Sequence, residues 1–386
     1  MIGSVSIFSI PDLIIVDSPN LYQNYRNIRI FRCSGYIYLL YLLVDMDHYS
    51  LWSERYESCR DRIFEDLRNY KLQIDRIRDR ISDKGLILPL KLSKKGINAR
   101  MCFVDGGEGI RELLGAAIYF IRASGLILDK NLRGGEEFIR DLDMNILDYD
   151  EYTKERVELL RGAMEFDVAL RCVEERDPEY LFMDGSLYVN ARKRPIECDE
   201  YPIYRKKFVR LLKLCKKNSV HILGVSEDSK SRLFSNYLAI KYDIKFPRFM
   251  TDSCILRILG GDEMYRTVEF TPQSRFESDD KLTSTLIASF PTVYVQPTHL
   301  SNPLRVDVPD WERDFDKIIS LVVQLSRGSK QYGYPLPLYL AHLDARIGKK
   351  QADWCARQLI HHISKKDIDL YNTILHETRR GFRPKS

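Results

Sequence analysis

The chain has 386 residues, with 60 Lys and Arg against 55 Asp and Glu, which gives a formal net charge of +5. At 44% hydrophobic and 30% charged residues it can bury a substantial core, which excludes a wholly disordered protein, and its length favours two or three domains or one large domain with an accessory arm. The nearly balanced charge excludes a polybasic, histone-like surface but leaves room for a local basic groove.

The first 45 residues differ in pattern from the rest of the chain. Their longest apolar stretch, Tyr36 to Val44, is much shorter than the ~20 residues that cross a bilayer, so it predicts a buried strand or helix. Met46 opens a more regular helical pattern. One interpretation is therefore that translation begins at Met46 and that residues 1–45 are not native.

A regular apolar stripe begins at Tyr56 and predicts a long helix that ends at residues 83–85. Its members are Tyr56, Ile63, Leu67, Tyr70, Ile74, Ile77 and Ile81, and from Ile63 onward the spacing alternates between four and three residues. Such a narrow stripe is typical of a helix that packs against another helix. Two interpretations stay open: the helix packs on its own domain, or it makes a dimer or partner contact.

Beyond residue 100, short apolar strands alternate with helices. We expect strands at 101–105, 113–128 (with a turn-permissive centre), 180–184, 220–225, 265–270 and 292–296, and helices at 152–175, 200–218, 311–327, 339–347 and within 351–378. This order predicts an α/β or α+β domain. The sequence contains neither a Walker A motif nor a G-x-G-x-x-G fingerprint, so it predicts no ATP-driven motor and no dinucleotide fold.

Lysine and arginine gather on one side of the helix expected at 200–218. They are Lys206, Lys207, Arg210, Lys213, Lys216 and Lys217. A solvated helix face is one interpretation. The other is a track for the DNA backbone, whose binding would weaken steeply with salt.

The chain has eight cysteines, and none are separated by the two residues that zinc knuckles and ribbons use. A disulfide framework is not expected in a chain of this length. The cysteines therefore predict reduced, mostly buried thiols in a cytoplasmic protein.

Two aspartates share an unusual setting. Asp105 and Asp184 each close an apolar strand and are followed at once by glycine, in FVDGG and FMDGS. A carboxylate at the end of a strand can point into a crevice and hold a hard cation such as Mg²⁺ or Mn²⁺. Two such strands, if adjacent, would bring both carboxylates to one metal site. An ordinary Asp-Gly turn is the alternative interpretation of each.

The helix expected between these strands carries Glu165, Glu174 and Glu175. An acid on its inward face would complete an Asp–Glu–Asp set. Strand acid, helix acid and strand acid is the order of a ribonuclease H-like metal site. Taken alone this signal is weak, because most helix glutamates are solvated.

Five segments between Phe103 and Ile347 resemble, in this order, the motifs of the NurA family of archaeal and bacterial nucleases. They read FVDGGEG, LFMDGSLY, ILGVSEDSKSRLF, HLSNPLRVDVP and YGYPLPLYLAHLDARI. The ordered set covers most of the chain beyond residue 95. The resemblance implies a ribonuclease H-like core, that is, an α/β fold with a mixed sheet flanked by helices, with an N-terminal helical arm and C-terminal helices. We therefore expect an accessory segment at 1–95 and a nuclease domain at 96–386.

The resemblance also implies the site. Asp105 and Asp184 match the two metal-binding aspartates of the family, and Glu165 is our choice for its glutamate because of its apolar surroundings, with Glu174 as the alternative. The expected catalytic set is Asp105, Glu165, Asp184, Tyr334 and His342, and the first three are the expected ligands of Mn²⁺ or Mg²⁺. His342 can act as a general acid or base, or orient the scissile phosphate.

One loop departs from the family pattern. Where many relatives read G-V-S-K, this chain has glutamate at the fourth position, Glu227. Lys230 or Arg232 in the same loop is expected to supply the DNA contact instead, unless the basic role is lost. The departure affects the phosphate contact of this loop, not the metal site.

The function that the resemblance implies is that of an Mn²⁺- or Mg²⁺-dependent DNA nuclease with 5′-to-3′ exonuclease and single-strand endonuclease activity. We expect a homodimer at the nucleoid that acts with a HerA-type hexameric translocase, alongside Mre11 and Rad50, in DNA end resection and double-strand break repair by homologous recombination. A DNA-binding scaffold subunit with weak or no catalysis on the same fold is the alternative. An RNA-cutting enzyme on this fold is a second alternative.

Overall fold

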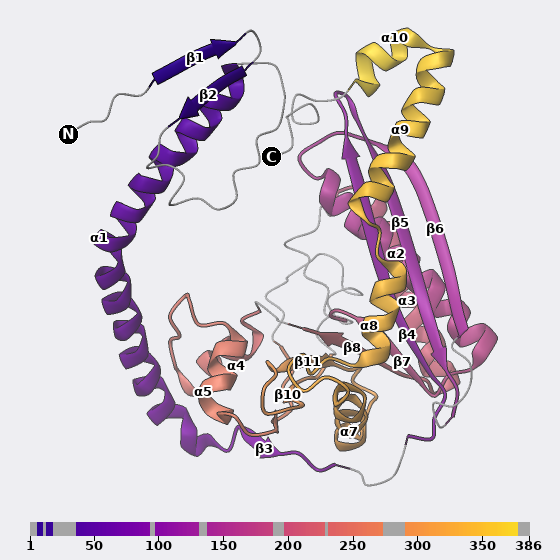
Figure 1. The fold of residues 1–386 in the computed structure, drawn as a ribbon. Helices are drawn as coiled ribbons and strands as arrows, with labels where there is room; N and C mark the ends of the chain where they lie inside the picture. The colour runs from indigo at the N-terminus through magenta and orange to yellow at the C-terminus, as the bar shows by residue number, and fades with distance from the viewer. Residues whose placement is uncertain are drawn as a thin grey trace. The chain divides into compact units, whose positions relative to one another are not determined.

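The computed structural model describes residues 6–10, 13–17, 36–92, 97–130, 137–187, 197–227, 231–272 and 290–376, with side chains from residue 49 onward. The chain divides into two compact units, Met1–Arg76 and Ile77–Ser386. Figure 1 shows the course of the chain through both units. Among the described helices, none is long and apolar enough to span a membrane.

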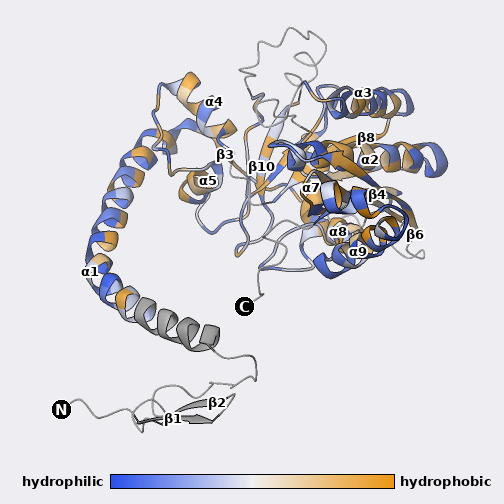
Figure 2. Cartoon of the chain, turned by 90° about the horizontal axis from the view of Figure 1, so that it is seen from above, coloured by the Kyte–Doolittle hydropathy of each residue, from blue (hydrophilic) through white to orange (hydrophobic). Residues whose placement is uncertain are grey.

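The first unit contains a hairpin and most of one long helix. β1 (Ser6–Ile10) pairs antiparallel with β2 (Leu13–Asp17), and α1 (Tyr36–Ile81) follows. The helix begins at Tyr36 instead of Tyr56, because the apolar segment after Tyr36 is itself helical. In this unit the predicted stripe is exposed, from Tyr56 to Tyr70. Figure 2, coloured by hydropathy, shows hydrophilic and hydrophobic residues mixed along α1. Its role in a dimer or partner contact stays a prediction.

The second unit is built on one mixed sheet. Among the described residues, its order is β3-β9-β10-β11-β8-β7-β4-β5-β6. The strands are β3 (Ile87–Pro89), β4 (Met101–Glu112), β5 (Ala116–Leu128), β6 (Glu137–Asp148), β7 (Tyr180–Asp184), β8 (His221–Ser226), β9 (Tyr265–Thr267), β10 (Thr292–Gln296) and β11 (Leu304–Asp307). β6, β5 and β4 are antiparallel, whereas β4, β7 and β8 are parallel. This is the strand order of a ribonuclease H-like core, so the predicted fold class is confirmed.

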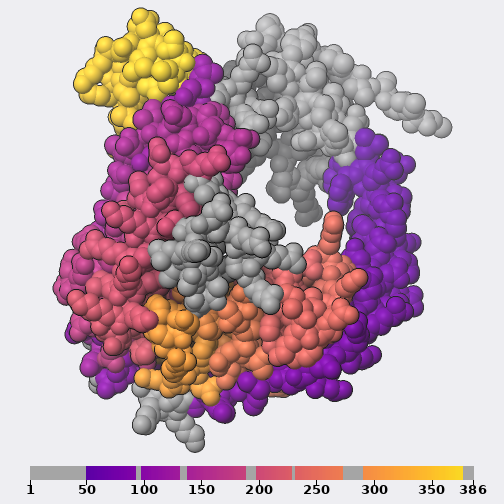
Figure 3. All heavy atoms as spheres, turned by 180° about the vertical axis from the view of Figure 1, so that it is seen from behind, coloured from indigo at the N-terminus to yellow at the C-terminus, as the bar shows by residue number. Residues whose placement is uncertain are grey.

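Helices cover both faces of this sheet. After α1, the described helices are α2 (Thr153–Arg176), α3 (Glu200–Asn218), α4 (Leu233–Tyr242), α5 (Asp252–Gly260), α7 (Phe315–Ser326), α8 (Leu336–Ala345), α9 (Lys349–Lys366) and α10 (Ile368–Leu370), with short 3₁₀ and π turns at η1 (Ser82–Lys84) and η4 (Tyr371–Leu375). α2 and α3 pack on one face of the sheet (Figure 1), and α7 and α8 pack on the other. The space-filling view in Figure 3 shows the last helices, in yellow, at one end of this unit.

Successive side chains of β4 point to opposite faces of the sheet. Cys102 and Val104 join the core under α2 and α3, whereas Met101 and Phe103 join the core under α7 and α8. Side chains in a strand alternate between faces. Asp105 therefore belongs to the face that α8 covers.

The prediction that a strand ends at Asp105 is wrong, because β4 continues through the glycines to Glu112. These glycines do not form a turn. They allow helices to pack closely against the strand. A Cβ atom at Gly106 would collide with the Glu165 carboxylate on α2, and one at Gly107 would collide with the Ala345 carbonyl of α8. The missing side chains let helices on both faces approach the sheet beside Asp105.

Most of the predicted strands and helices beyond residue 150 are present in the structure. α2, β7, α3, β8 and β10 lie where the sequence predicts them, within one or two residues. The turn expected inside 113–128 is absent, because β5 runs unbroken through twelve antiparallel pairs with β4. The sequence reading omitted β6, β11, α4 and α5. β6 was omitted because it lies at the edge of the sheet and is mostly exposed, so its alternation of apolar and polar residues is weak.

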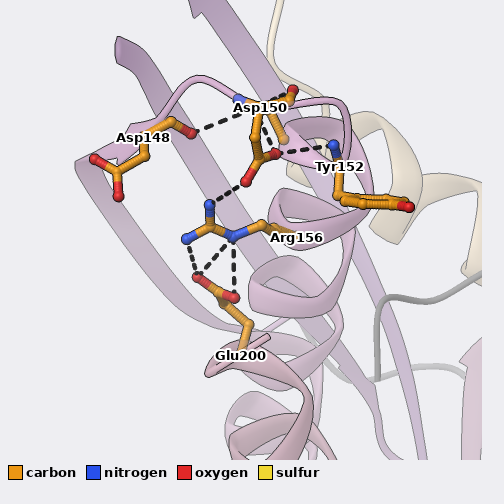
Figure 4. A network of polar contacts seen from close by, with 6 residues as sticks. Asp148, Asp150, Tyr152, Arg156 and Glu200 are labelled. Atoms are coloured by element: carbon orange, nitrogen blue, oxygen red, sulfur yellow. Dashed lines mark hydrogen bonds and ion pairs between the residues drawn. The ribbon is translucent and has the colours of Figure 1, made fainter. Parts of the chain in front are cut away.

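Arg156, near the start of α2, ties this helix to its neighbours (Figure 4). Its Nη1 donates to Asp150 Oδ2 at 2.8 Å and its Nη2 to Glu200 Oε1 at 2.9 Å, and Asp150 also accepts from the Tyr152 amide. Burial alone would raise the pKa of Glu200, but hydrogen bonds from Arg156 and from the backbone bring it below its ordinary value. The network fixes the start of α2 against α3, and α2 is the helix that carries Glu165.

Candidate metal centre

Two aspartates meet where adjacent parallel strands carry them. β4 and β7 pair as far as Val104 and Met183, so the next residues, Asp105 and Asp184, lie side by side. The Asp105 side chain is almost completely buried. After Asp184 the chain turns at Gly185, whose φ of +87° favours glycine. The turn predicted from Asp-Gly is therefore present after Asp184 and absent after Asp105.

Two residues from the C-terminal part of the domain contact these carboxylates. His342, on α8, places Nδ1 2.7 Å from Asp105 Oδ2. Tyr334, just before α8, donates its hydroxyl to Asp184 Oδ1 at 2.5 Å and also approaches the Val225 carbonyl at 3.4 Å. The helix α8 thus delivers the contact to Asp105, and the residues just before it deliver the contact to Asp184.

Asp105, Asp184 and His342 offer three ligand atoms that all lie within 4.8 Å of one another. Carboxylate oxygens suit Mg²⁺ and Mn²⁺, and an imidazole nitrogen is compatible with a transition metal such as Mn²⁺. Their number, chemistry and spacing fit a divalent cation.

Glu165 approaches Asp105 from the opposite face of the sheet. Its side chain is buried over Gly106, and Arg161 Nη1 donates to Glu165 Oε1 at 2.7 Å. Arg161 also donates to the Gly106 carbonyl at 3.2 Å and to Glu108 Oε2 at 3.1 Å. Arg161 was not identified from the sequence, although a pair of opposite charges four residues apart on a helix is a usable signal.

The other glutamates of α2 lie elsewhere. Glu174 pairs with Arg210 of α3 at 3.1 Å, and Glu175 pairs with Arg171 at 3.5 Å, with all four side chains largely exposed. Nine residues separate Glu165 from Glu174, which corresponds to roughly 13 Å along a helix. The structure therefore brings Glu165, and not Glu174, to Asp105.

The acids destabilise one another's charged forms. Burial, followed by the neighbouring charges of Asp184 and Glu165, raises the pKa of Asp105 to about 9. The Gly106 amide and Arg161 act in the opposite direction but do not compensate. A site that raises the pKa of a carboxylate in this way favours a bound cation, because the cation compensates the crowded negative charge.

We expect the metal-free protein to lose stability as the pH rises. Because the pKa of Asp105 is raised in the folded state, its stabilising protonation is complete below the unfolded value of 3.8 and is lost as the pH rises through about 9. Urea unfolding in EDTA across this pH window measures the effect. Asp105→Asn should flatten the decline, and an identical pH slope in both proteins would contradict the assignment.

The DNA contact predicted for the loop after β8 stays a prediction. Lys230 lies outside the described residues. Arg232 donates to the carbonyls of Phe246 and Arg248, at 3.1 and 3.4 Å. Burial and then the nearby Glu227 carboxylate raise the pKa of Tyr332. The sequence drew attention to Glu227, but nothing in it pointed to Tyr332.

The basic side of α3 is partly engaged with other side chains. Lys207 pairs with Asp167 at 2.5 Å, Arg210 pairs with Glu174, and the Lys216 ammonium lies 5.2 Å from the centre of the Trp311 ring. These contacts reduce the charge available to a DNA backbone. A DNA track on α3 stays a prediction.

Comparison with known proteins places this site in a family. Residues 99–347 match the family model of the NurA domain. The chain is 26% identical over 284 residues to the DNA double-strand break repair nuclease NurA of Sulfolobus acidocaldarius, covering 66% of this chain and 78% of the relative. It is 23% identical over 269 residues to the protein of the same name from Saccharolobus solfataricus, covering 63% and 75%.

Solved structures share the fold. The NurA nuclease from Sulfolobus solfataricus superposes with a TM-score of 0.54 at 21% identity, covering 80% of this chain and 98% of the other. A structure described as NurA with manganese gives a TM-score of 0.55 at 14% identity, with the same coverage. The domain match spans well over half of the 386 residues and contains the five predicted site residues. The chain therefore belongs to the NurA family.

Proposed function

We propose that this protein is a metal-dependent nuclease that hydrolyses phosphodiester bonds in DNA during double-strand break repair. The observation that carries the proposal is the meeting of Asp105, Asp184 and His342, with three ligand atoms within 4.8 Å. This cluster lies inside the segment that matches the NurA domain, and both named relatives are DNA double-strand break repair nucleases.

Asp105, Asp184 and Glu165 are the metal ligands that we propose, and His342 lies beside them as the acid or base. Manganese is our first choice, with Mg²⁺ as the alternative, because a solved structure of this fold is described as containing manganese. A bound divalent cation would polarise the scissile phosphate and make an attacking water more acidic.

The protein's own groups then have distinct tasks. Asp105 holds Nδ1 of His342, and the ring is half exposed, so Nε2 is available to hold or release a proton at the scissile phosphate. The Tyr334 hydroxyl fixes Asp184, and the Arg161 guanidinium fixes Glu165. These contacts keep the carboxylates in place while the substrate binds.

The finer parts of the proposal rest on the family resemblance. They are 5′-to-3′ exonuclease and single-strand endonuclease activity, a homodimer, a HerA-type translocase partner, cooperation with Mre11 and Rad50 in end resection, and a location at the nucleoid. Residues 96–386 are the nuclease domain that we propose, because they enclose the family match.

A scaffold subunit that binds DNA without cutting it is the second candidate. Glu227 favours it, because a carboxylate stands where many relatives have a lysine that can contact phosphate. Such a subunit would bind DNA and show no turnover with any divalent cation.

The test is cleavage of end-labelled single-stranded DNA by the full-length protein with Mn²⁺. We expect shortened DNA with Mn²⁺, no cleavage after treatment with EDTA, and little cleavage of RNA of the same sequence. DNA binding without cleavage in Mn²⁺ or Mg²⁺ would favour the scaffold. Preferential cleavage of RNA would overturn the assignment to DNA.

A further inference from the structure

Aromatic rings form a chain beside the metal centre. The ring centre of Tyr332 lies 5.6 Å from that of Tyr334 and 5.5 Å from that of Tyr339, and Tyr339 lies 6.3 Å from His342 with nearly parallel planes. Tyr334 and His342 contact the two aspartates directly. Tyr332 is thus one ring removed from Asp184.

Tyr332 differs from its neighbour in exposure. Its side chain is 43% exposed, whereas Tyr334 is 4% exposed. Glu227 directly follows β8 and is itself exposed. Val225, two residues earlier, pairs with Asp184 and lies 3.4 Å from the Tyr334 hydroxyl, so Glu227 stands at the same end of the sheet. Burial and then the nearby Glu227 carboxylate raise the pKa of Tyr332. An accessible ring and a carboxylate therefore stand together at the edge of the metal centre.

We propose that Tyr332 and Glu227 form a nucleobase subsite next to the metal centre. In this subsite the Tyr332 ring stacks on an unpaired base, and Glu227 accepts a hydrogen bond from an exocyclic amino group of that base. The inference rests on the proposed function, because the base belongs to a nucleotide whose phosphate lies at Asp105 and Asp184.

The chemistry of the two side chains favours a base over a phosphate or sugar contact. A carboxylate repels phosphate, but it has about four acceptor positions, so Glu227 can accept a hydrogen bond from a base. Glutamate pairs with the N4 amino group of cytosine, whereas thymine and uracil present an oxygen acceptor at that position. Stacking on tyrosine needs an unstacked base, which single-stranded DNA supplies.

The test compares two mononucleotides that differ at position 4 of the base. dCMP carries an amino group there and dUMP a carbonyl oxygen, and neither contains a phosphodiester that the enzyme could cleave. Their dissociation constants are measured by calorimetry with the full-length protein and Mn²⁺. We expect the wild type to bind dCMP about tenfold more tightly than dUMP.

Three variants separate stacking from hydrogen bonding. Tyr332→Leu should weaken both nucleotides by about tenfold or more, because the ring is lost. Tyr332→Phe keeps the ring and should bind dCMP nearly as tightly as the wild type. Glu227→Gln should remove the preference for dCMP, because an amide can donate to the uracil oxygen as well as accept.

Tyr149→Leu is the matched control. Tyr149 is also about as exposed, at 42%, and its hydroxyl also bonds a glutamate, Glu112 Oε2, at 3.2 Å. Glu112 is the last residue of β4, seven residues beyond Asp105, so replacing Tyr149 should leave both dissociation constants unchanged. Each variant is checked for an unchanged melting temperature.

Either of two results would overturn the subsite. One is equal affinity of the wild type for dCMP and dUMP; the other is unchanged affinity in Tyr332→Leu. Failure of the subsite and failure of the proposed function remain distinguishable. DNA cleavage without any effect of Tyr332→Leu on nucleotide binding would remove the subsite alone. Selective dCMP binding by a protein that cuts no DNA would remove the nuclease alone.

Discussion

Asp105→Asn is expected to reduce Mn²⁺-dependent DNA cleavage by about a thousandfold, because a metal site contributes several kcal/mol to transition-state stabilisation and 1.36 kcal/mol corresponds to a factor of ten. The substitution keeps the size of the side chain and removes its charge. Cleavage of end-labelled single-stranded DNA, measured under single-turnover conditions, gives the rate of the chemical step.

The same variant should be more stable than the wild type when metal is absent. Burial, followed by the charges of Asp184 and Glu165, raises the pKa of Asp105 to about 9. Between about pH 4 and 9 the folded protein must therefore keep this carboxyl protonated, and Asn avoids that cost. Lost cleavage together with a raised melting temperature in EDTA would separate a lost ligand from a misfolded protein. Undiminished cleavage by Asp105→Asn would show that the site is misplaced or that a contaminant cuts the DNA.

Glu165→Gln is expected to reduce cleavage by about a hundredfold or more, comparable to the loss of one preorganised group at a reacting phosphate. Glutamine can still accept the hydrogen bond from Arg161 Nη1, now 2.7 Å from Glu165 Oε1, so the packing over Gly106 is kept. What is removed is the negative charge. Weaker Mn²⁺ binding, measured by the electron paramagnetic resonance signal of free Mn²⁺, should accompany the loss.

Glu174→Gln, on the same helix, is the matched control. Its carboxylate forms an exposed pair with Arg210, and such pairs contribute roughly 0–1 kcal/mol. Cleavage and Mn²⁺ binding should therefore stay close to those of the wild type. If Glu174→Gln abolished cleavage and Glu165→Gln did not, the proposed ligand set would have to be revised.

A turn was predicted after both Asp184 and Asp105, and the structure has it only after Asp184. At Asp184 the following glycine makes the predicted turn, with a positive φ. At Asp105 the same dipeptide continues a strand. The difference comes from long-range packing, because β5 pairs along the whole length of β4 and two helices press on its glycines.

Long-range packing also decides whether Glu165 or Glu174 lies at the metal centre. Apolar spacing was enough to predict α2 and the strand β7 that follows it, because periodicity follows from burial on one face. The apolar surroundings of Glu165 favoured it over Glu174. Only the tertiary structure shows that α2 packs over Gly106 at Glu165, whereas Glu174 forms an exposed pair with Arg210.

The sequence by itself predicted an α/β or α+β domain, the strands that carry Asp105 and Asp184 and the helix between them, because these depend on local hydrophobic patterns. Tertiary structure decided that the two strands are adjacent and parallel. The sequence also named Tyr334 and His342, whose roles stay predictions until the variants are measured. The tertiary structure alone decided that Arg161 holds Glu165 and that Glu227 meets Tyr332. Glu227 and Tyr332 are far apart in the chain, and their meeting depends on how β8 and the loop before α8 pack at one end of the sheet.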